Sequence, residues 1–302
     1  MQNEDTFDLE AYLSEKKAVV DTALKACFPE PEGLASELVS AMKYSVFAGG
    51  KRLRPILCIS AAEAVGGVET DVLPVACAIE FIHTYSLIHD DLPVMDDDDI
   101  RRGRPTSHKV FGEAVALLAG DGLLTEAFNL MTLPELTDKV SAGVILKLIG
   151  MVSVAAGYRG MVGGQIVDIQ SEGKQVGLPV VEFIHKHKTG ELITVPLVCG
   201  AILGGGDESQ IEAVSSYGRK IGLAFQISDD ILDIEGDTST FGKQVGSDEQ
   251  KGKLTYPAVV GLERSKQVQS ELIEAAVECL HDLDKAAEPL RHIARYIIER
   301  NK

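Results

Sequence analysis

Two aspartate clusters lie inside otherwise apolar stretches of this chain, and they constrain its fold more than any other feature. They comprise Asp90, Asp91 and Asp96 and, about 140 positions later, Asp229, Asp230 and Asp233. Carboxylates this close repel one another unless a cation lies between them. Mg²⁺ suits such a site, because it accepts one or two carboxylates and takes its other ligands from water and phosphate. Two such clusters facing each other would form a clamp for a diphosphate.

A run of acids is most often a solvated loop, but the flanks of these clusters disfavour that interpretation. The stretches that precede them are mostly apolar, as expected of buried helices. Asp229 and Asp233 are four positions apart and therefore share one face of a helix. Pro93 predicts that the preceding helix ends just after Asp91, so that Asp96 can fold back towards the same metal ion.

Helical spacing of apolar residues runs through nearly the whole chain, and convincing strands of period 2 are absent. Asp207 is a suitable N-cap for the helix that carries the second cluster. No linker separates the two halves, so residues 1–302 predict a single all-α domain. Residues 236–252 form the longest expected loop, and loops of this length often carry function. The helices expected from these signals include 8–28, 34–48, 111–130, 139–156, 160–171 and 180–203.

The formal net charge of −17 disfavours a nucleic-acid partner, because phosphate backbones require a basic surface. Basic residues nevertheless gather at 51–54, 101–104 and 243–253, a distribution that suits a small anionic substrate. The five cysteines are scattered without a CxxC pair, which favours reduced thiols. We find no signal peptide and no apolar run of membrane-spanning length without charges or glycine breaks. We therefore expect a soluble cytoplasmic protein with no membrane span.

The segment 49–55, GGKRLRP, lies at a helix junction and has two interpretations. A glycine pair lets the backbone approach a ligand, and the guanidinium of Arg54 can bind a diphosphate through two hydrogen bonds. The segment is equally compatible with a glycine helix end followed by a basic helix start. The residues of this motif alone do not decide between the two.

The motifs together resemble those of the trans-isoprenyl diphosphate synthases, in order and over about residues 40–260. They are GGKRLRP, DDLPVMDDDDIRRGRPTSH, GGQIVD, KTGEL, FQISDDILD and a basic loop. The resemblance is to the short-chain bacterial branch of this polyprenyl synthetase family. It implies an all-α helical bundle around a central cavity and an enzyme that couples isopentenyl diphosphate head to tail to an allylic diphosphate. It also implies a homodimer and three Mg²⁺ ions bound with the allylic diphosphate, with Mn²⁺ as the alternative metal.

The resemblance assigns a role to each matched residue, and every position below agrees with the family pattern. The first metal motif corresponds to Asp90, Asp91 and Asp96, and the second to Asp229, Asp230 and Asp233. The isopentenyl diphosphate pocket corresponds to Lys51, Arg54, His83 and Arg102. Contacts to the allylic diphosphate correspond to Arg101, Lys188, Lys243 and Lys253, with Thr189 and Gln226 beside the reacting carbon.

Other polar residues near these motifs have weaker assignments. His83 outside its motif would be interpreted as a core histidine. His185 and His187 have no motif context and are predicted to be surface or structural residues. Gln165 and Asp168, in GGQIVD, are expected to orient Lys188 or metal-bound water, as hydrogen-bonding partners of ligands do.

Tyr85 is the candidate for limiting product length. It lies five residues before Asp90, about 7.5 Å along the helix axis, so a chain anchored at the aspartates would pass it. The residue alone favours a core tyrosine. In the resemblance, a bulky residue here limits elongation, with Ser86 beside it. An aromatic residue favours farnesyl diphosphate (C15) over geranylgeranyl diphosphate (C20), and geranyl diphosphate (C10) is the other alternative.

Two further functions fit part of the pattern. A class I terpene cyclase shares a DDxxD motif but lacks the GGKRLRP pocket for a second diphosphate. A non-catalytic subunit of a heteromeric synthase tends to lose one aspartate motif, and both are intact here. The expected chemistry is ionisation of the allylic substrate, condensation and elimination. No side chain in the motifs is an obvious base, so the departing pyrophosphate is expected to remove the final proton.

Overall fold

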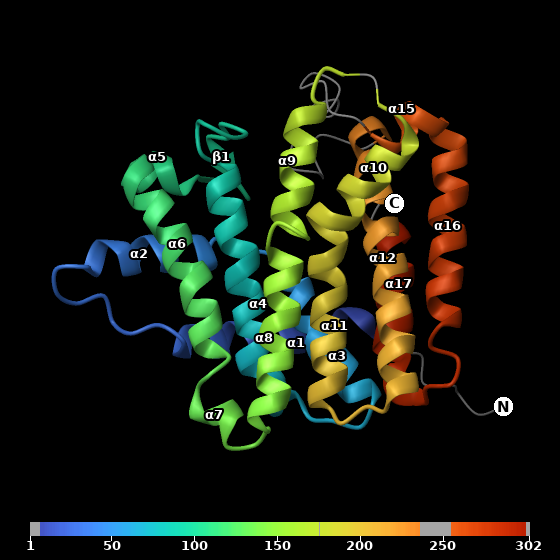
Figure 1. Ribbon diagram of the computed structural model, residues 1–302, viewed down its shortest axis with the longest axis horizontal. Coiled ribbons are helices and arrows are strands. Elements are labelled where there is room, and N and C mark those ends of the chain that lie inside the picture. Colours follow the sequence, from blue (N-terminus) through green and yellow to red (C-terminus); the bar gives the residue numbers. More distant parts are fainter. Residues whose placement is uncertain (1–6, 175, 236–254, 300–302) are drawn as a thin grey trace. The chain divides into compact units, whose positions relative to one another are not determined.

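The structure of the protein is a computed structural model that describes residues 7–174, 176–235 and 255–299. Within these ranges the chain is almost entirely helical, which confirms the all-α class (Figure 1). The described strands are β1 (Ile100–Arg101) and β2 (Arg104–Pro105), which pair antiparallel in one short hairpin. The predicted loop 236–252 lies outside the described residues.

The chain divides into two compact units whose segments alternate along the sequence. Unit 1 comprises Met1–Tyr12, Leu57–Glu69 and Gly150–Lys302, and unit 2 comprises Leu13–Ile56 and Thr70–Ile149. Helices α1 (Leu9–Ala26), α3 (Leu53–Ala64) and α8 (Ala142–Ala156) contribute residues to both units. The expectation of a single domain stays a prediction.

Unit 2 carries the first aspartate cluster at the end of α4 (Glu69–Asp90). Within it α6 (Glu113–Leu130) packs against α2 (Ser36–Val46) and α5 (Ser107–Phe111), and α7 (Pro134–Thr137) follows. The sequence predicted one helix over 111–130, but Gly112 has φ +82° and separates α5 from α6. A left-handed glycine stops one helix and lets the next begin in a new direction.

Unit 1 carries the second aspartate cluster on the long helix α12 (Glu208–Glu235). This helix packs against α11 (Glu191–Leu203), α16 (Leu262–Glu278) and α17 (Glu288–Glu299). The remaining described elements are α9 (Met161–Ser171), α10 (Leu178–Ile184), the π-helix η1 (His185–Gly190), α15 (Tyr256–Val260) and the short 3₁₀-helix η2 (Lys285–Ala287).

A capping box begins α12. The Asp207 side chain accepts the backbone N–H of Gln210 at 2.8 Å, and the Gln210 side chain accepts the N–H of Asp207 at 3.0 Å. The structure thus confirms the predicted N-cap at Asp207. At the helix middle, the fully buried Tyr217 donates its hydroxyl to the carbonyl of Leu290 at 2.6 Å, which joins α12 to α17.

The π-helix η1 lies between α9 and α12 in close backbone contact with both. A Cβ added to Gly164 of α9 would lie 2.2 Å from the backbone nitrogen of Lys188. One added to Gly222 of α12 would lie 2.9 Å from the Cα of Gly190. Larger residues at these positions would force η1 away. The glycines therefore explain how Lys188 and Thr189 come close to α9 and α12.

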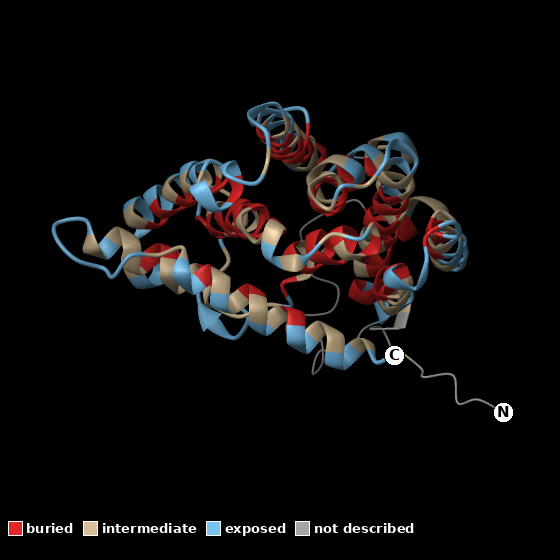
Figure 2. Ribbon diagram, turned by 90° about the horizontal axis from the view of Figure 1, so that it is seen from below, coloured by how far each residue is buried: buried red, intermediate tan, exposed pale blue. Residues whose placement is uncertain are grey.

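Most helices are buried on one side and exposed on another (Figure 2). In α17 the buried residues recur at Leu290, Ile293, Ala294 and Ile297, one face of an amphipathic helix. Three helical stretches are long and apolar enough to cross a membrane, namely Glu69–Asp90, Glu113–Thr137 and Ala142–Ser171. In the first of these, 67% of the apolar window is buried inside the protein. The absence of a membrane span stays a prediction.

Candidate functional site

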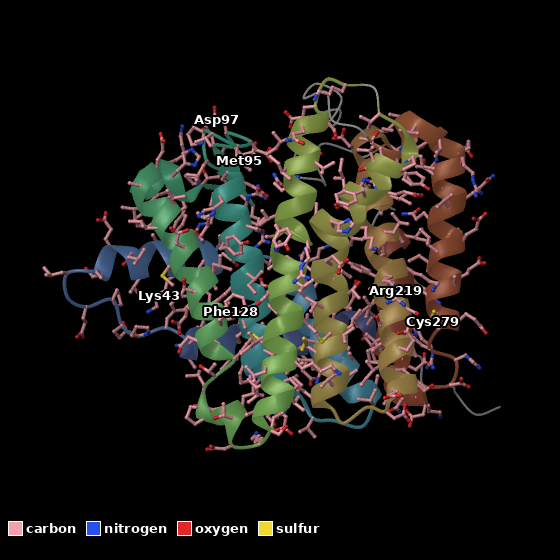
Figure 3. The ribbon with its side chains drawn as sticks, in the orientation of Figure 1. Lys43, Met95, Asp97, Phe128, Arg219 and Cys279 are labelled. Atoms are coloured by element: carbon pink, nitrogen blue, oxygen red, sulfur yellow. The ribbon has the colours of Figure 1, made fainter. Side chains whose placement is uncertain are left out.

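The first aspartate cluster is formed by the end of α4 and the turn that follows it. The helix ends at Asp90, and the N–H of Asp96 donates to the Asp90 carbonyl at 2.9 Å. The chain after Pro93 therefore folds back on the helix end, which brings Asp96 to Asp90 as the sequence predicted. Met95 and Asp97 lie in the same turn (Figure 3).

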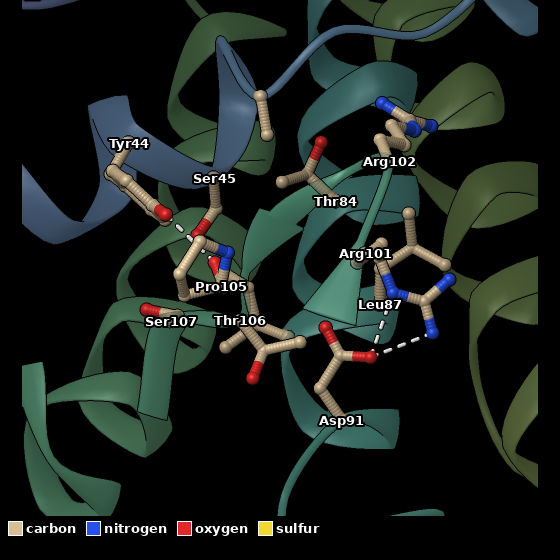
Figure 4. Close-up of a pocket in the computed structure, with 12 residues that line it drawn as sticks. Tyr44, Ser45, Thr84, Leu87, Asp91, Arg101, Arg102, Pro105, Thr106 and Ser107 are labelled. Atoms are coloured by element: carbon tan, nitrogen blue, oxygen red, sulfur yellow. Dashed lines mark hydrogen bonds and ion pairs between the residues drawn. The ribbon is translucent and has the colours of Figure 1, made fainter. Parts of the chain in front are cut away.

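Asp91 of this cluster is bound by Arg101 from the hairpin. Both Nε and Nη2 of Arg101 lie 2.7 Å from Asp91 Oδ1 (Figure 4). Asp91 is only 4% exposed, and burial raises the pKa of its carboxyl, although the Arg101 guanidinium acts in the opposite direction. In this structure Arg101 thus binds a predicted metal ligand. Its guanidinium also lies close enough to the first cluster to interact with a diphosphate bound there.

A small pocket adjoins this ion pair. Its lining includes Tyr44, Thr84, Asp91, Arg101 and Arg102, and the Tyr44 hydroxyl donates to the Pro105 carbonyl at 2.7 Å (Figure 4). The cavity volume of about 30 Å³ holds about two water molecules. The pocket is therefore too small for a diphosphate as it stands.

Cationic side chains surround His83 in unit 2. The pKa of His83 lies well below its usual value because the surrounding protein desolvates the ring and because Arg54 and Arg102 add positive charge nearby. Arg102 donates from Nη1 to the carbonyl of Gly49, and a Cβ at Gly50 would lie only 2.4 Å from that nitrogen. The glycine pair of GGKRLRP thus lets a guanidinium lie directly over the backbone. The arrangement creates a site of positive potential around a neutral histidine, which suits an anion.

Arg52, in the same motif, has a different role that the sequence did not indicate. It is 4% exposed, and it donates to Asp21 at 2.8 Å, to Glu80 at 2.7 Å and to the Val46 carbonyl at 2.7 Å. Two carboxylates and a carbonyl satisfy its guanidinium, as a buried charge requires. Arg52 therefore anchors the motif to α1 and α4, which leaves Lys51 and Arg54 as the candidates for ligand binding.

Tyr85 and Ser86 lie on α4, one turn and more before Asp90. Tyr85 is 6% exposed, its ring packs edge-on against His89 at 5.6 Å, and burial raises its pKa to about 12. Ser86 donates its hydroxyl to the carbonyl of His83 at 2.9 Å. Tyr85 is thus a neutral, fixed aromatic residue on the helix that leads to the first cluster.

The second cluster lies on α12 in unit 1, and its members have different partners. Asp230 Oδ2 accepts the backbone N–H of Tyr256 at 2.7 Å and lies 3.3 Å from His185 Nε2. Asp229 Oδ2 lies 3.5 Å from the side-chain nitrogen of Gln226. Asp233 is 6% exposed. The two clusters belong to different units, so the expected clamp between them stays a prediction.

Three residues with predicted roles come together beside this cluster, namely Thr189 and Gln226, expected beside the reacting carbon, and Lys188, expected to contact the allylic diphosphate. Lys188 donates from Nζ to Asp168 Oδ2 at 2.6 Å, which is the orienting contact expected of Asp168. Thr189 donates its hydroxyl to the side-chain oxygen of Gln226. Gln226 in turn reaches Asp229, so a chain of polar contacts joins η1 to the second cluster.

Two further sets of candidate ligands do not belong to the two aspartate clusters described above. Lys243 and Lys253, predicted to contact the allylic diphosphate, lie outside the described residues. Among the described residues, Asp97, Asp99 and His108 bring ligand atoms within 4.8 Å of one another. Lys109 already neutralises Asp99 at 2.8 Å, so this group is a poorer cation site than the two clusters.

The donor chemistry of the two clusters fits a hard divalent cation. Each offers carboxylate oxygens, which Mg²⁺ prefers. Asp91 and Asp230 are each held by protein groups through a single oxygen atom. Ligating carboxylates are commonly fixed by such contacts. We therefore expect the six predicted aspartates to be the residues that hold the metal.

Comparison with known proteins agrees with this geometry. The family model for polyprenyl synthetase matches residues 35–293. The chain belongs to the polyprenyl synthetase family. The chain is 49% identical to a farnesyl diphosphate synthase of Geobacillus stearothermophilus, covering 97% of this chain and 98% of the relative. It is 48% identical to a heterodimeric geranylgeranyl pyrophosphate synthase large subunit of Arabidopsis thaliana, covering 98% of this chain and 80% of the relative.

A solved structure agrees as well. The crystal structure of an FPP/GFPP synthase from Zymomonas mobilis matches with a TM-score of 0.86 at 37% identity, over 96% of this chain and 98% of that one. This polyprenyl synthetase therefore has the all-α isoprenoid-synthase fold and is a prenyltransferase. The family assignment confirms the resemblance on which the residue roles were based.

Proposed function

We propose that this polyprenyl synthetase couples isopentenyl diphosphate head to tail to dimethylallyl and geranyl diphosphate and releases farnesyl diphosphate. One observation carries the proposal. Unit 2 combines a carboxylate cluster, suited to a metal-bound diphosphate, with arginines close to His83, of which Arg102 lies over the Gly49–Gly50 backbone, and these suit a second diphosphate bound without metal. A chain-elongation reaction requires two diphosphate sites with different binding chemistry. A terpene cyclase does not require the second.

Each diphosphate has its own residues. Lys51, Arg54, His83 and Arg102 bind isopentenyl diphosphate, where fixed positive charge replaces water around the phosphates. The aspartates of both clusters hold Mg²⁺, and bound Mg²⁺ neutralises charge on the leaving diphosphate. Arg101, Lys188, Lys243 and Lys253 contact the allylic diphosphate. Charge pairs at 4 Å contribute ~1 kcal/mol in water and ~4 kcal/mol at an effective dielectric constant of 20, so several such contacts favour ionisation.

Thr189 and Gln226 act beside the carbon that becomes positive. Since Thr189 donates its proton to Gln226, its oxygen keeps lone pairs to direct at an electron-poor carbon. Lys188 stays oriented by Asp168 and supplies positive charge to the departing diphosphate instead. These residues separate the stabilisation of the cation from that of the leaving group. The double bond of isopentenyl diphosphate then attacks the cation, and the departing pyrophosphate takes the proton released on elimination.

Product length distinguishes the two leading alternatives. The buried Tyr85 on α4 supports a C15 product, because it narrows the path of a growing chain. The similarity to Arabidopsis geranylgeranyl pyrophosphate synthases supports the C20 alternative. The homodimer, the number of Mg²⁺ ions and the cytoplasmic location stay predictions.

Product analysis tests the proposal directly. The purified protein is incubated with isopentenyl diphosphate, Mg²⁺ and, separately, dimethylallyl, geranyl or farnesyl diphosphate, and the products are separated by chromatography. We expect C15 product from the first two primers and no elongation of the third. Accumulation of C20 product would favour the geranylgeranyl alternative. Failure to elongate any primer would overturn the proposal.

A further inference from the structure

His185 is a buried polar residue that no predicted role uses. It begins the π-helix η1, three residues before Lys188, and it is 5% exposed. Its Nε2 lies 3.3 Å from Asp230 Oδ2, whereas its Nδ1 is buried without a hydrogen-bond partner among the described residues. A carboxylate oxygen can only accept, so the ring proton belongs on Nε2, facing Asp230. The sequence predicted a surface or structural histidine and gave no sign of this contact.

Asp230 is held from two sides through the same oxygen atom. Oδ2 also accepts the backbone N–H of Tyr256, the first residue of α15, at 2.7 Å. The Tyr256 ring lies nearly parallel to the His185 ring at 6.1 Å and packs in a buried cluster with Val181, Ile227 and Ile231. Asp230 therefore links η1, α12 and α15. Both contacts use Oδ2, so they fix the carboxylate, and among the described residues no contact to Oδ1 is seen.

We propose that His185 is a positioning residue for the second aspartate cluster, acting through Asp230. By holding Oδ2, His185 and the Tyr256 N–H orient Oδ1 as a metal ligand, in the way that hydrogen-bonding partners orient ligating carboxylates. The same contact ties the start of η1 to α12, which keeps Thr189 in reach of Gln226. The expected effect on turnover rests on the proposed function. The expected effect on the Tyr256 hydrogen bond does not.

The substitution His185→Leu removes the donor and keeps the bulk, and His185→Gln restores an N–H at the end of a similar side chain. His187→Gln is the matched control, because His187 belongs to the same π-helix but bonds through Nδ1 to the carbonyl of Phe183 at 2.8 Å. His185→Asn, whose amide is too short to reach Asp230, is the second variant should the leucine variant not fold.

The first measurement is amide hydrogen exchange of the full-length protein at Tyr256, which needs no substrate. In His185→Leu we expect the Tyr256 amide to exchange at least ~10-fold faster, because the Asp230 carboxylate that accepts its hydrogen bond is no longer held by His185. In His187→Gln we expect unchanged exchange. Equal exchange in the wild type and in both His185→Leu and His185→Asn would overturn the proposal. This outcome is independent of whether the protein makes any prenyl product.

The second measurement is steady-state kinetics with Mg²⁺ titration. We expect His185→Leu to lower kcat 10–100-fold and to raise the Mg²⁺ concentration for half-maximal rate, the range found for such partners of metal ligands. KM for isopentenyl diphosphate should not change, since its proposed pocket lies in unit 2. His185→Gln should recover most of the loss. Faster exchange at Tyr256 with an unchanged kcat and Mg²⁺ requirement would overturn the positioning role and leave His185 a purely structural residue.

Discussion

The two aspartate clusters have similar sequences but different backbones. In the first, α4 ends at Asp90 and a turn returns the N–H of Asp96 to the Asp90 carbonyl at 2.9 Å. In the second, all the aspartates lie on the uninterrupted helix α12. The geometry of the first cluster therefore depends on a local turn set by Pro93. That of the second depends on how α12 packs against its neighbours.

The partners of the clusters differ as well. Asp91 is held by the guanidinium of Arg101, a full positive charge that the proposed substrate also needs. Asp230 is held by a backbone N–H and a histidine. The first cluster is thus partly neutralised by the protein, and Arg101 must share its charge when a diphosphate binds.

The largest expected effect comes from removing an aspartate of the second cluster. Asp229→Ala should lower kcat by at least ~10²-fold, because it removes a group that stabilises charge in the transition state. The measurement is steady-state product formation at saturating Mg²⁺ and substrates.

The control for that variant is Glu235→Ala, at the end of the same helix, where the carboxylate pairs with Lys266 at 2.7 Å on the surface. We expect it to retain activity within about twofold, since surface substitutions of this kind have small effects. Near-normal activity of Asp229→Ala would contradict a catalytic role for the second cluster.

Arg101→Gln tests the charged partner of the first cluster. It leaves the buried Asp91 carboxylate without its cation, so the free energy of unfolding should fall by ~1–3 kcal/mol. Urea unfolding measures the loss, and Mg²⁺ should recover part of it by supplying another cation. Arg104→Gln, in the same hairpin, removes a guanidinium that lies 4.9 Å above the Tyr44 ring and should cost at most ~1 kcal/mol. Equal losses of unfolding free energy in the two variants would show that the Arg101–Asp91 ion pair stabilises the protein no more than the exposed Arg104 contact does.

The features that could be predicted were those that local chemistry dictates. Helical periodicity gave the all-α class, and Asp207 as an N-cap gave the start of α12. Pro93, which ends the helix after Asp91, gave the fold-back of Asp96. Each of these follows from residues that are near one another in the sequence.

What could not be predicted depends on contacts between distant segments. The π-helix η1 exists where Gly164 and Gly222 allow two helices to approach its backbone, and no periodicity signals it. In the sequence Arg52 cannot be distinguished from the other basic residues of its motif. Its structural role follows only from its contacts with the distant Asp21 and Glu80. His185 gave no signal because Asp230, which its Nε2 faces, and Tyr256, whose ring lies beside it, are about 45 and 71 positions away.

The helices that lead into the two clusters differ in a way that product length can expose. Tyr85 stands five residues before Asp90, whereas the residue five before Asp229 is the fully buried Ala224. If the growing chain follows α4, Tyr85→Ala should lengthen the main product by at least one five-carbon unit, because the aromatic ring no longer blocks it. Chromatography of products formed from geranyl diphosphate measures this.

Ala224→Gly is the matched control for chain length. It also removes side-chain volume from a helix one turn and more before an aspartate cluster, at a stability cost of about 1 kcal/mol. Product length should stay that of the wild type, since the growing chain is expected to follow α4 and not α12. A longer product from Ala224→Gly, or an unchanged product from Tyr85→Ala, would show that Tyr85 is not the residue that limits product length.

The smallest expected effect tests whether the second cluster depends on the whole of α12 or only on its end. Asp207→Ala removes the N-cap, 22 residues before Asp229, and should lower the free energy of unfolding by ~1 kcal/mol. Asp207→Asn keeps a capping oxygen and should be nearly neutral. We expect kcat to stay within about twofold in both variants, because Gln226, His185 and the Tyr256 N–H hold the cluster locally. A loss of activity in Asp207→Ala that tracks its loss of stability would instead mean that the geometry of the cluster is set by the helix as a unit.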